Sequence, residues 1–484
     1  MQPSMTQVED STNLPSSKCG ASSNNNLAKS WKHRFSLESL CESASPLKES
    51  AKNLDGQNSV LLGAARPHSQ FYPWQSIKMH ATKEAELGWD GDGMNMSCAR
   101  GRGPFDLADA LNYGLTSGEP QLVHFFKSHV RDTHNPLYRD WDTCLSCGST
   151  AAIDIALRMF TSRGHSILVE QFTYTGTMIA ARKQGLTTVG IKMDEYGLDP
   201  YDLDRVLTNW DSRLGKKPFV LYTIPSGQNP TGTTQPTWRK TQIYEVAENH
   251  DLFIIEDDPY YLLSLEPEHG LALPASYLSL DTTGRVLRLD SASKILAPGL
   301  RAGWVTGCAQ VIDLYVSFAD VCTLAPSGPT QAMLVELLVK AWGKDGLSAW
   351  ISSLSSSYRT RRDIVLVACE KFLDKSICQW SQPEVGMFLW IRLNAEHHQA
   401  WGAIQHGDEE QRRQFCKKIE DTICQSAEEA GVIIAQGSWF AAGDLVSNSV
   451  YFRLSYVTAP EEALAGAVEK FSHCIDLEFG SSSL

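Results

Sequence analysis

Polar side chains follow three apolar runs of strand length in the middle of the chain. Their types include an amine that can attack a carbonyl group, a carboxylate that can hold a proton, and a guanidinium that can bind an anion. Because parallel strands bring their carboxyl ends to one edge of a sheet, we expect these side chains to lie together. The runs, each with the polar residues that follow it, are 219–222 with Asn229, 252–255 with Asp257 and Tyr260, and 286–289 with Ser291, Lys294 and Arg301.

The motifs NPTG at 229–232, DDPY at 257–260 and SASK at 291–294 occur in this order. Together they resemble the fold-type I pyridoxal-phosphate aminotransferases, in the branch of fungal aromatic and kynurenine/α-aminoadipate aminotransferases. The resemblance extends from about residue 61 to 475. It implies an α/β fold: a large domain with a mostly parallel seven-stranded sheet between helices, and a smaller α+β domain.

The same resemblance implies the cofactor and the reaction. Pyridoxal 5'-phosphate would accept the amino group of an aromatic L-amino acid (tryptophan, phenylalanine or tyrosine) and pass it to a 2-oxo acid in a ping-pong mechanism. A homodimer with shared active sites is implied as well. Enzymes of this branch serve both primary aromatic amino acid metabolism and dedicated secondary-metabolite routes.

Three residues, Lys294, Asp257 and Tyr174, match the catalytic positions of that family. Lys294 would form the resting Schiff base with the cofactor and then move the substrate proton. Asp257 would lie beside the ring nitrogen and keep it protonated by raising its pKa. Asp258 competes for that role, but its place before Pro259 favours a side chain that stabilises a turn. Glu256 is expected on the opposite face of the strand.

The phosphate group requires a dense set of donors. Ser149 and Thr150 open an expected helix, whose first N–H groups would face the anion. Ser291 and Arg301 match positions that add a hydroxyl and a guanidinium. Tyr113 resembles a tyrosine that reaches the phosphate bound by the partner subunit.

The remaining candidates surround the cofactor ring and the substrate. Tyr174 resembles the aromatic side chain that stacks on the ring, and Asn229 and Tyr260 would donate to its phenolic oxygen. Arg453 matches the arginine that binds the substrate carboxylate. Relatives usually carry an apolar residue where this sequence has Arg66, in a segment that lines the side-chain pocket. Arg66 therefore leaves open a preference for an acidic side chain.

The elements that must position these residues can be inferred from periodicity. Between about 100 and 345, short apolar runs alternate with helical patterns, which is typical of βα units. After 345, a long helix precedes strands that look antiparallel. The expected helices are 150–160, one that begins at Pro120, and 350–372, and the strongest late strands are 387–391 and 450–454.

This pattern divides the chain into four parts. Residues 1–55 are rich in serine and asparagine and are predicted to form a mobile arm. Residues 56–100 are assigned to the small domain as its N-terminal part. Residues 101–345 form the large cofactor-binding domain and 346–484 the C-terminal part of the small domain.

Composition excludes several other classes. The 43 basic and 56 acidic residues give a net charge of −13, which argues against a nucleic-acid-binding surface. No apolar run reaches the roughly 20 residues of a membrane helix, and no signal peptide is evident, so we expect a cytoplasmic protein without a membrane partner. The 12 cysteines are too sparse for a disulfide scaffold, and no metal site is expected.

Two alternatives stay open at this level. One is a transcription regulator that fuses a DNA-binding module to an aminotransferase-like domain, although the first 60 residues lack periodic helices with a basic face. The other keeps the cofactor but changes the reaction to a C–S lyase or a decarboxylase.

Overall fold

The computed structural model describes residues 26–41, 65–82, 93–266, 273–443 and 448–480. Its central sheet has seven strands among these residues, in the order β3-β11-β10-β9-β8-β4-β5. The five strands from β10 to β5 are parallel, whereas β11 is antiparallel to both of its neighbours. This confirms the predicted mostly parallel sheet. The strands are β3 (Trp141–Ser146), β4 (Ser166–Glu170), β5 (Thr187–Ile191), β8 (Val220–Thr223), β9 (Phe253–Asp257), β10 (Val286–Ser291) and β11 (Gly303–Cys308).

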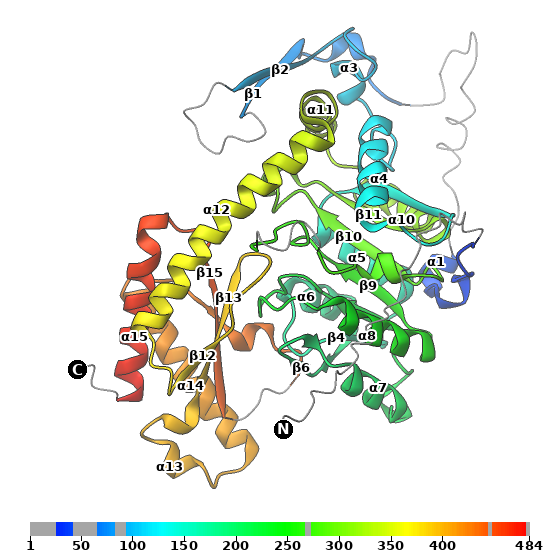
Figure 1. Ribbon diagram of the computed structural model, residues 1–484. Helices are drawn as coiled ribbons and strands as arrows, with labels where there is room; N and C mark the ends of the chain where they lie inside the picture. The colour runs from blue at the N-terminus through cyan, green and yellow to red at the C-terminus, as the bar shows by residue number, and fades with distance from the viewer. Residues whose placement is uncertain (1–25, 42–64, 83–92, 267–272, 444–447, 481–484) are drawn as a thin grey trace, which may run out of the picture.

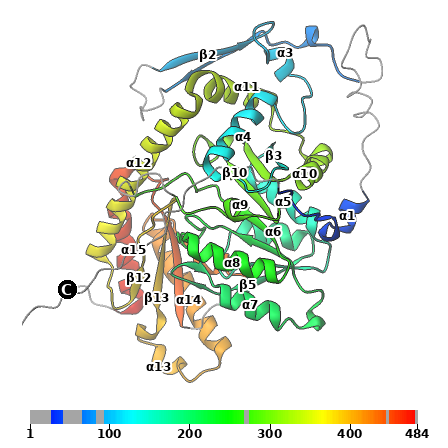
Figure 2. The ribbon, with the colours of Figure 1, turned by 45° about the vertical axis from the view of Figure 1, so that its right-hand side comes forward.

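Helices lie on both sides of this sheet (Figures 1 and 2). Because both faces are covered, every residue of β4, β8, β9 and β10 is buried, and apolar residues make up most of β4, β8 and β9. The helices are α4 (Pro120–His134), α5 (Ser149–Phe160), α6 (Thr175–Lys183), α7 (Pro200–Thr208), α8 (Thr237–Asn249), α9 (Tyr277–Leu280) and α10 (Ala309–Cys322). A short strand pair, β6 (Met193–Asp194) and β7 (Gly197–Leu198), precedes α7.

The second sheet is antiparallel, with the order β12-β13-β15-β14. Its central pair joins the two late strands expected from the sequence. α14 packs on β15, and α15 packs on both α14 and α12. The elements are β12 (Cys378–Trp380), β13 (Phe388–Asn394), β14 (Ala435–Gln436), β15 (Ser449–Ser455), α12 (Gly343–Phe372), α13 (Trp401–Ile404), α14 (Glu409–Glu429) and α15 (Leu464–Phe479).

A continuous helical path leads into this second part of the molecule. α11 (Gly328–Leu334) passes through a π-helical segment, η5 (Val335–Trp342), into α12. The long helix therefore begins before the expected 350, and the indole rings of Trp342 and Trp350 stack 5.5 Å apart near its start.

Two strands, β1 (Ser76–Ala81) and β2 (Met94–Ala99), pair with each other as a separate antiparallel sheet. This strand pair contacts η5 through β2, and Cys98 packs with residues of α3 (Leu107–Ala110) and α11. In Figure 1 it lies at the top, away from the four-stranded sheet. The described part of 56–100 thus does not extend the sheet of the small domain, and residues 56–64 lie outside the described residues.

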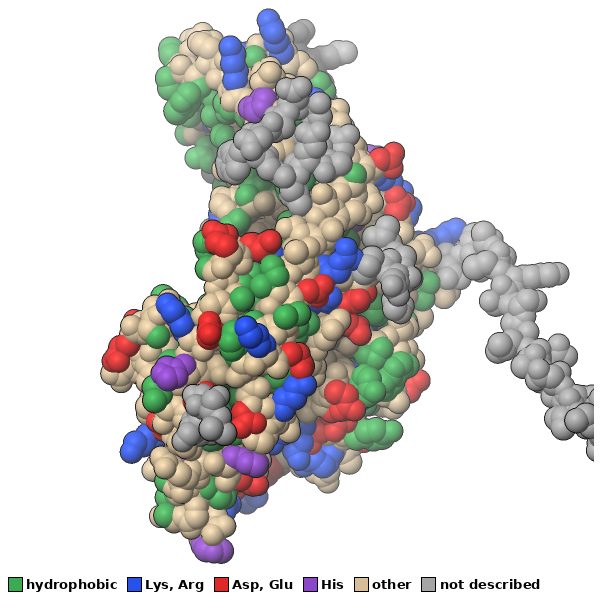
Figure 3. Space-filling view, turned by 60° about the vertical axis from the view of Figure 1, so that its left-hand side comes forward, with side chains coloured by type: hydrophobic (Ala, Val, Ile, Leu, Met, Phe, Trp, Pro, Cys, Tyr) green, Lys and Arg blue, Asp and Glu red, His purple; other side chains and the backbone are tan. Residues whose placement is uncertain are grey.

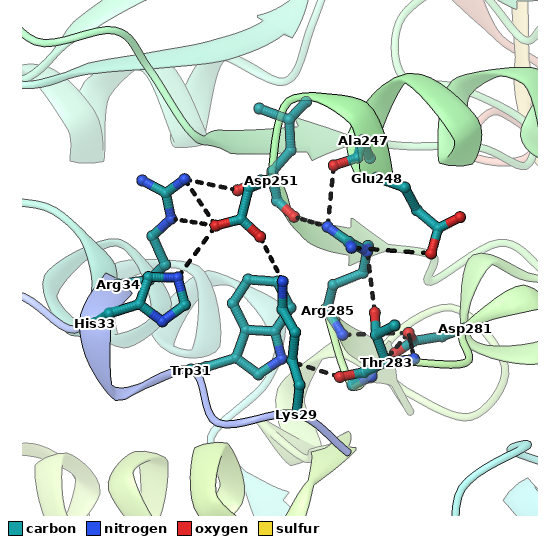
Figure 4. Close-up of polar contacts among 12 residues, drawn as sticks. Lys29, Trp31, His33, Arg34, Ala247, Glu248, Asp251, Asp281, Thr283 and Arg285 are labelled. Atoms are coloured by element: carbon teal, nitrogen blue, oxygen red, sulfur yellow. Dashed lines mark hydrogen bonds and ion pairs between the residues drawn. The ribbon is translucent and has the colours of Figure 1, made fainter. Parts of the chain in front are cut away.

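The segment 26–41 was predicted to be part of a mobile arm, and this is wrong for these residues. Trp31 is completely buried, and its ring packs edge-on against Phe253 of β9 at 5.3 Å. The Trp31 indole N–H also donates to the carbonyl of Thr283, 3.1 Å away. A single large aromatic residue therefore anchors a polar stretch to the sheet (Figure 4). Residues 1–25 and 42–55 of the predicted arm lie outside the described residues.

Asp251 is the shared hydrogen-bond and ion-pair partner of three basic side chains in this segment (Figure 4). Lys29 Nζ lies 2.5 Å from its Oδ1, and His33 Nε2 and Arg34 Nε lie 3.1 and 3.0 Å from its Oδ2. Although burial raises the pKa of Asp251, the hydrogen bonds from Lys29 and His33 and the charge of Arg34 hold it well below its usual range.

Asp251→Asn should loosen the anchored segment, because the three basic side chains lose their shared negative partner. We expect a loss of about 1 kcal/mol in unfolding free energy and faster tryptic cleavage after Lys29 and Arg34, measured by thermal melting and limited proteolysis. Asp211→Asn, which removes an ion pair with Arg213 only two residues away, is the control. Equal cleavage rates in the two variants would contradict this role for Asp251.

Main-chain hydrogen bonds connect the two parts of the molecule beside the end of β4. The N–H of Thr173 donates to the carbonyl of Phe440 at 2.9 Å, and the N–H of Ala442 donates to that of Gln171 at 2.8 Å. Gly190 of β5 allows this approach, since a Cβ atom there would lie 2.1 Å from the Ala442 carbonyl oxygen. A segment before β15 is therefore joined to the edge of the large sheet.

Three further observations bear on the class of protein. No helix within the described ranges has the length and apolarity needed to cross a bilayer, and none of the eleven cysteines in those ranges forms a disulfide. On the face shown in Figure 3, acidic and basic side chains are interspersed rather than gathered into one basic patch.

Candidate active site

The ends of β8, β9 and β10 bring the predicted residues to one edge of the sheet. Lys294 follows β10 and is half-buried. Burial lowers the pKa of Lys294, the charges of Arg453 and Arg301 lower it further, and Asp257 opposes them. These four residues, which are up to 196 positions apart, therefore share one electrostatic environment.

Asp257 ends β9 and is buried. The hydroxyl group of Tyr222, on β8, donates to its Oδ2 at 2.6 Å. Its Oδ1 is buried and has no hydrogen-bond partner among the described residues. Burial raises the pKa of Asp257 to about 7, although the hydrogen bond from Tyr222 opposes this. A buried carboxylate with one free oxygen can hold a positively charged N–H group.

Asp258 does not stabilise a turn as predicted. Its carboxylate lies 2.9 Å from a guanidinium nitrogen of the buried Arg288, and it accepts a hydrogen bond from Ser226 at 3.2 Å. Arg288 also contacts Glu256 at 3.1 Å and Asp290 at 3.0 Å. Glu256 therefore lies on the face opposite Asp257, as expected, and Asp258 serves a buried ion-pair cluster.

The start of α5 has the features of an anion site. Gly148 precedes it with a φ of 85°, and a Cβ atom there would lie 2.6 Å from Nη2 of Arg301. The hydroxyl oxygen of Ser149 is buried without a partner among the described residues, and Thr150 is exposed beside it. Arg301 is held here because its Nη2 donates to the carbonyl of Cys147 at 3.2 Å.

Ser291 lies next to this cradle at the end of β10. Its hydroxyl oxygen accepts from the N–H of Ser293 at 3.1 Å, and Arg301 donates to the hydroxyl of Ser293 at 3.4 Å. The structure thus brings Ser149, Ser291 and Arg301 to the anion site, while Ser293 links two of them.

Arg453 lies on β15, and its guanidinium packs against two aromatic rings. The Phe388 centroid is 4.5 Å away and the Phe440 centroid 4.7 Å. Its Nη1 donates to Oδ1 of Asn229 at 2.7 Å, and its Nε is buried without a partner among the described residues. Burial lowers the pKa of Arg453. The side chain is therefore fixed in a plane with free donors, which suits a carboxylate.

Aromatic side chains surround this arginine. Trp390 of β13 stacks on Tyr451 at 5.4 Å, and Phe172 meets both rings, at 5.2 and 4.9 Å. The buried Tyr260 meets Phe388 edge-on at 5.5 Å. Tyr174, at the start of α6, is half-buried and interacts electrostatically with both Tyr260 and Arg453.

Arg66 and Tyr113 line a different pocket, of about 580 Å³, and none of the residues around Lys294 lines it. The Tyr113 side chain is 68% exposed. Within one chain, the structure therefore does not support Arg66 as a substrate-binding residue beside Lys294. The contribution of Tyr113 to a partner subunit stays a prediction. The pocket is also lined by Phe105, Asp109, Asn112, Glu119 and Gln331.

The sequence interpretation missed Tyr222 and Phe440. Tyr222 carried a usable signal, because it lies near the end of β8 at the same sheet edge as Asp257. Phe440 carried none, since it belongs to a short turn, η7 (Gly437–Phe440), far from the motifs in sequence. The described ranges hold no cluster of three or more metal-binding side chains.

Comparisons with known proteins agree with this arrangement. The family model for aminotransferase class I and II matches residues 107–471. Aminotransferase swnA of Metarhizium robertsii is 47% identical over 97% of this chain and 96% of its own length. An aromatic amino acid aminotransferase of Schizosaccharomyces pombe is 35% identical over 93% of this chain and 98% of its own.

A solved structure shares the fold as well. Aminotransferase Aro8 from Candida albicans superposes with a TM-score of 0.87 at 34% identity, covering 94% of this chain and all of that one. Because these alignments include most of the N-terminal region, they do not support a DNA-binding module fused to an aminotransferase-like domain. The chain therefore belongs to the class I and II aminotransferase family and is an aminotransferase.

Proposed function

We propose that this aminotransferase binds pyridoxal 5'-phosphate at the edge formed by β8, β9 and β10, and that it uses an aromatic L-amino acid as donor and a 2-oxo acid as acceptor. The observation that carries the proposal is the buried, unpartnered Oδ1 of Asp257. The charge of Asp257 acts on Lys294, as the charge of Arg453 does. A buried acceptor without a donor is costly to a protein unless a ligand completes it.

The residues present fit the cofactor. Asp257 Oδ1 would accept a hydrogen bond from the protonated ring nitrogen, with Tyr222 orienting the carboxylate. The start of α5, the unpartnered Ser149 hydroxyl and Arg301 would hold the phosphate. When bound, pyridoxal phosphate supplies an electron sink for the charge left when the donor loses its α-proton.

Lys294 would hold the cofactor through Nζ and carry the substrate proton. Burial and the neighbouring guanidinium groups favour its neutral amine, which is the form able to accept a proton. A general base is most effective when its pKa lies near the working pH, so this lowering suits the role.

Arg453 would bind the α-carboxylate of donor and acceptor alike. Its plane is fixed by Phe388 and Phe440, and its Nη1 is bonded to Asn229, which leaves Nε and Nη2 on one edge for a carboxylate. Holding the carboxylate in this way would orient the α-hydrogen of the substrate toward Lys294.

An aromatic donor is supported by the side chains beside Arg453 and by the names of similar proteins. Phe172, Trp390 and Tyr451 pack together, and Trp390, which is only partly buried, would offer flat apolar surface to a phenyl or indole ring. L-tyrosine:2-oxoglutarate aminotransferase amt1 of Serpula lacrymans is 33% identical over 84% of this chain. Arg66 lies in a separate pocket within the chain, so it gives no support for a dicarboxylic donor there.

We also propose a homodimer in which Tyr113 reaches the phosphate held by the partner subunit. The exposure of Tyr113, and its position beside Arg66 in a pocket outside the Lys294 environment, support this arrangement.

The donor is tested by following each half-reaction through the absorbance of the bound cofactor. We expect wild type to react with tryptophan, phenylalanine and tyrosine at least about tenfold faster than with glutamate, since apolar burial favours the rings. Arg66→Leu should change kcat/KM for tryptophan less than about threefold, because within the chain Arg66 lies outside the surroundings of Lys294. Rapid reaction with glutamate and none with any aromatic donor would contradict the aromatic assignment.

A further inference from the structure

The carboxylate of Glu170 is completely buried at the end of β4, and its hydrogen bonds join it to the last residue of β8 and to the segment that follows this strand. Its Oε1 accepts from the hydroxyl of Thr223 at 2.7 Å and from the N–H of Ile224 at 3.1 Å. Its Oε2 accepts from Nε2 of Gln228 at 3.0 Å. An ionised carboxylate only accepts hydrogen bonds, so it suits three donors that converge on it.

The side-chain amide of Gln228 continues these contacts into the loop. Its Nε2 also donates to the carbonyl of Phe172 at 2.6 Å. Its Oε1 accepts from both the N–H and the hydroxyl of Thr231, each at 2.8 Å. The nitrogen end of the amide thus faces two acceptors and the oxygen end two donors, which fixes its orientation.

Asn229 lies between these two anchored residues. Its own side-chain oxygen accepts from Nη1 of Arg453 at 2.7 Å, so the orientation of Arg453 depends on the placement of Asn229. We propose that Glu170 is a positioning residue for substrate binding, because it fixes the loop through Gln228 and Thr231 and thereby sets the direction of the Arg453 guanidinium. This inference rests on the proposed function, in which Arg453 binds the substrate carboxylate.

An amide at position 170 cannot replace the carboxylate. In Glu170→Gln, the new amide nitrogen would face either Nε2 of Gln228 or the N–H of Ile224, so that two donors meet in both orientations. If the amide of Gln228 turned over in the first case, its nitrogen would instead face the N–H of Thr231 and its oxygen the carbonyl of Phe172. Each arrangement leaves mismatched buried groups at position 170 or in the segment that leads to Asn229.

The test is the affinity for 3-phenylpropionate, an unreactive aromatic carboxylate, measured by calorimetry on the cofactor-loaded enzyme. For Glu170→Gln we expect Kd to rise about tenfold, the loss of one well-oriented hydrogen bond to the carboxylate. KM for donor and acceptor should rise in parallel, while kcat changes less than about threefold. Asp202→Asn is the matched control. Asp202, on α7, is also buried, and its carboxylate accepts a hydrogen bond from the backbone N–H of Lys192 at 3.0 Å.

A folded, cofactor-loaded Glu170→Gln variant whose Kd stays within about twofold of wild type would overturn the inference. If that variant does not fold, Thr231→Val decides, because it removes one hydroxyl bond to Gln228 and should raise Kd about threefold; an unchanged Kd overturns the inference. Wild type that fails to bind 3-phenylpropionate would contradict the aromatic proposal instead. Acetate, which offers Arg453 a carboxylate alone, then serves as the probe for the same comparison.

Discussion

Replacing Lys294 with alanine should abolish turnover and leave the fold intact. The side chain is only half-buried, so its loss leaves the packing of the sheet unchanged. It is also the amine whose pKa is lowered by burial and by two guanidinium groups, which favours the neutral form able to accept the substrate proton. We expect the rate to fall by at least about 10⁴-fold.

The measurement combines activity with covalent labelling. Borohydride treatment of wild type should fix the cofactor to the peptide that contains Lys294, and circular dichroism of Lys294→Ala should match wild type. The label found on another lysine would show that a different residue holds the cofactor.

Asp257→Asn should slow both half-reactions by about 10²- to 10³-fold. The amide is nearly the same size but carries no charge, so it cannot stabilise the protonated ring nitrogen that makes the cofactor an electron sink. Asp258→Asn is the comparison, because the carboxylate of Asp258 forms an ion pair with Arg288 and is not the one proposed to hold the ring nitrogen. A near-normal rate for Asp257→Asn would mean that another group protonates the ring.

The cofactor-free protein offers an independent readout of Asp257. Its folded pKa, about 7, lies above its ordinary value of 3.8 because of burial. The folded state therefore retains a proton that the unfolded state has lost, and this contribution to stability declines as pH rises from about 4 through about 7. The melting temperature of cofactor-free Asp257→Asn should therefore fall less steeply over that pH range than the melting temperature of cofactor-free wild type. Equal slopes would contradict a shifted pKa at this residue.

The large sheet could be predicted because short, fully buried parallel strands have a simple sequence pattern. The runs before Asn229 and Asp257 are apolar throughout, the run before Lys294 is interrupted only by Arg288, and each run is followed by polar side chains at the strand end. The anchored segment around Trp31 could not be predicted in this way. Its partners, Asp251 and Thr283, lie more than 200 positions away in the sequence. A single tryptophan among serine-rich neighbours also gives no periodic pattern from which burial could be predicted.

The residues of the candidate site likewise divide into those that could be predicted from the sequence and those that could not. Motifs on adjacent strand ends indicated Lys294, Asp257 and Asn229, because their spacing follows from the sheet itself. Phe440 and Glu170 escaped notice, since their roles arise from contacts with side chains on other elements. Asp258 was misassigned for the same reason: its partner Arg288 is on the next strand.

The main-chain hydrogen bonds between 171–173 and 440–442 have a consequence for how such an enzyme can diversify. Peptide groups make these bonds, so they do not depend on which side chains stand at the two segments. A change of side chain at 172 or 440 would thus leave the two segments joined, while a change at 440 would alter the ring that packs against Arg453. The freedom ends at Gly190, where any side chain would collide with the Ala442 carbonyl, and at Thr173 and Ala442, where proline would remove a donor.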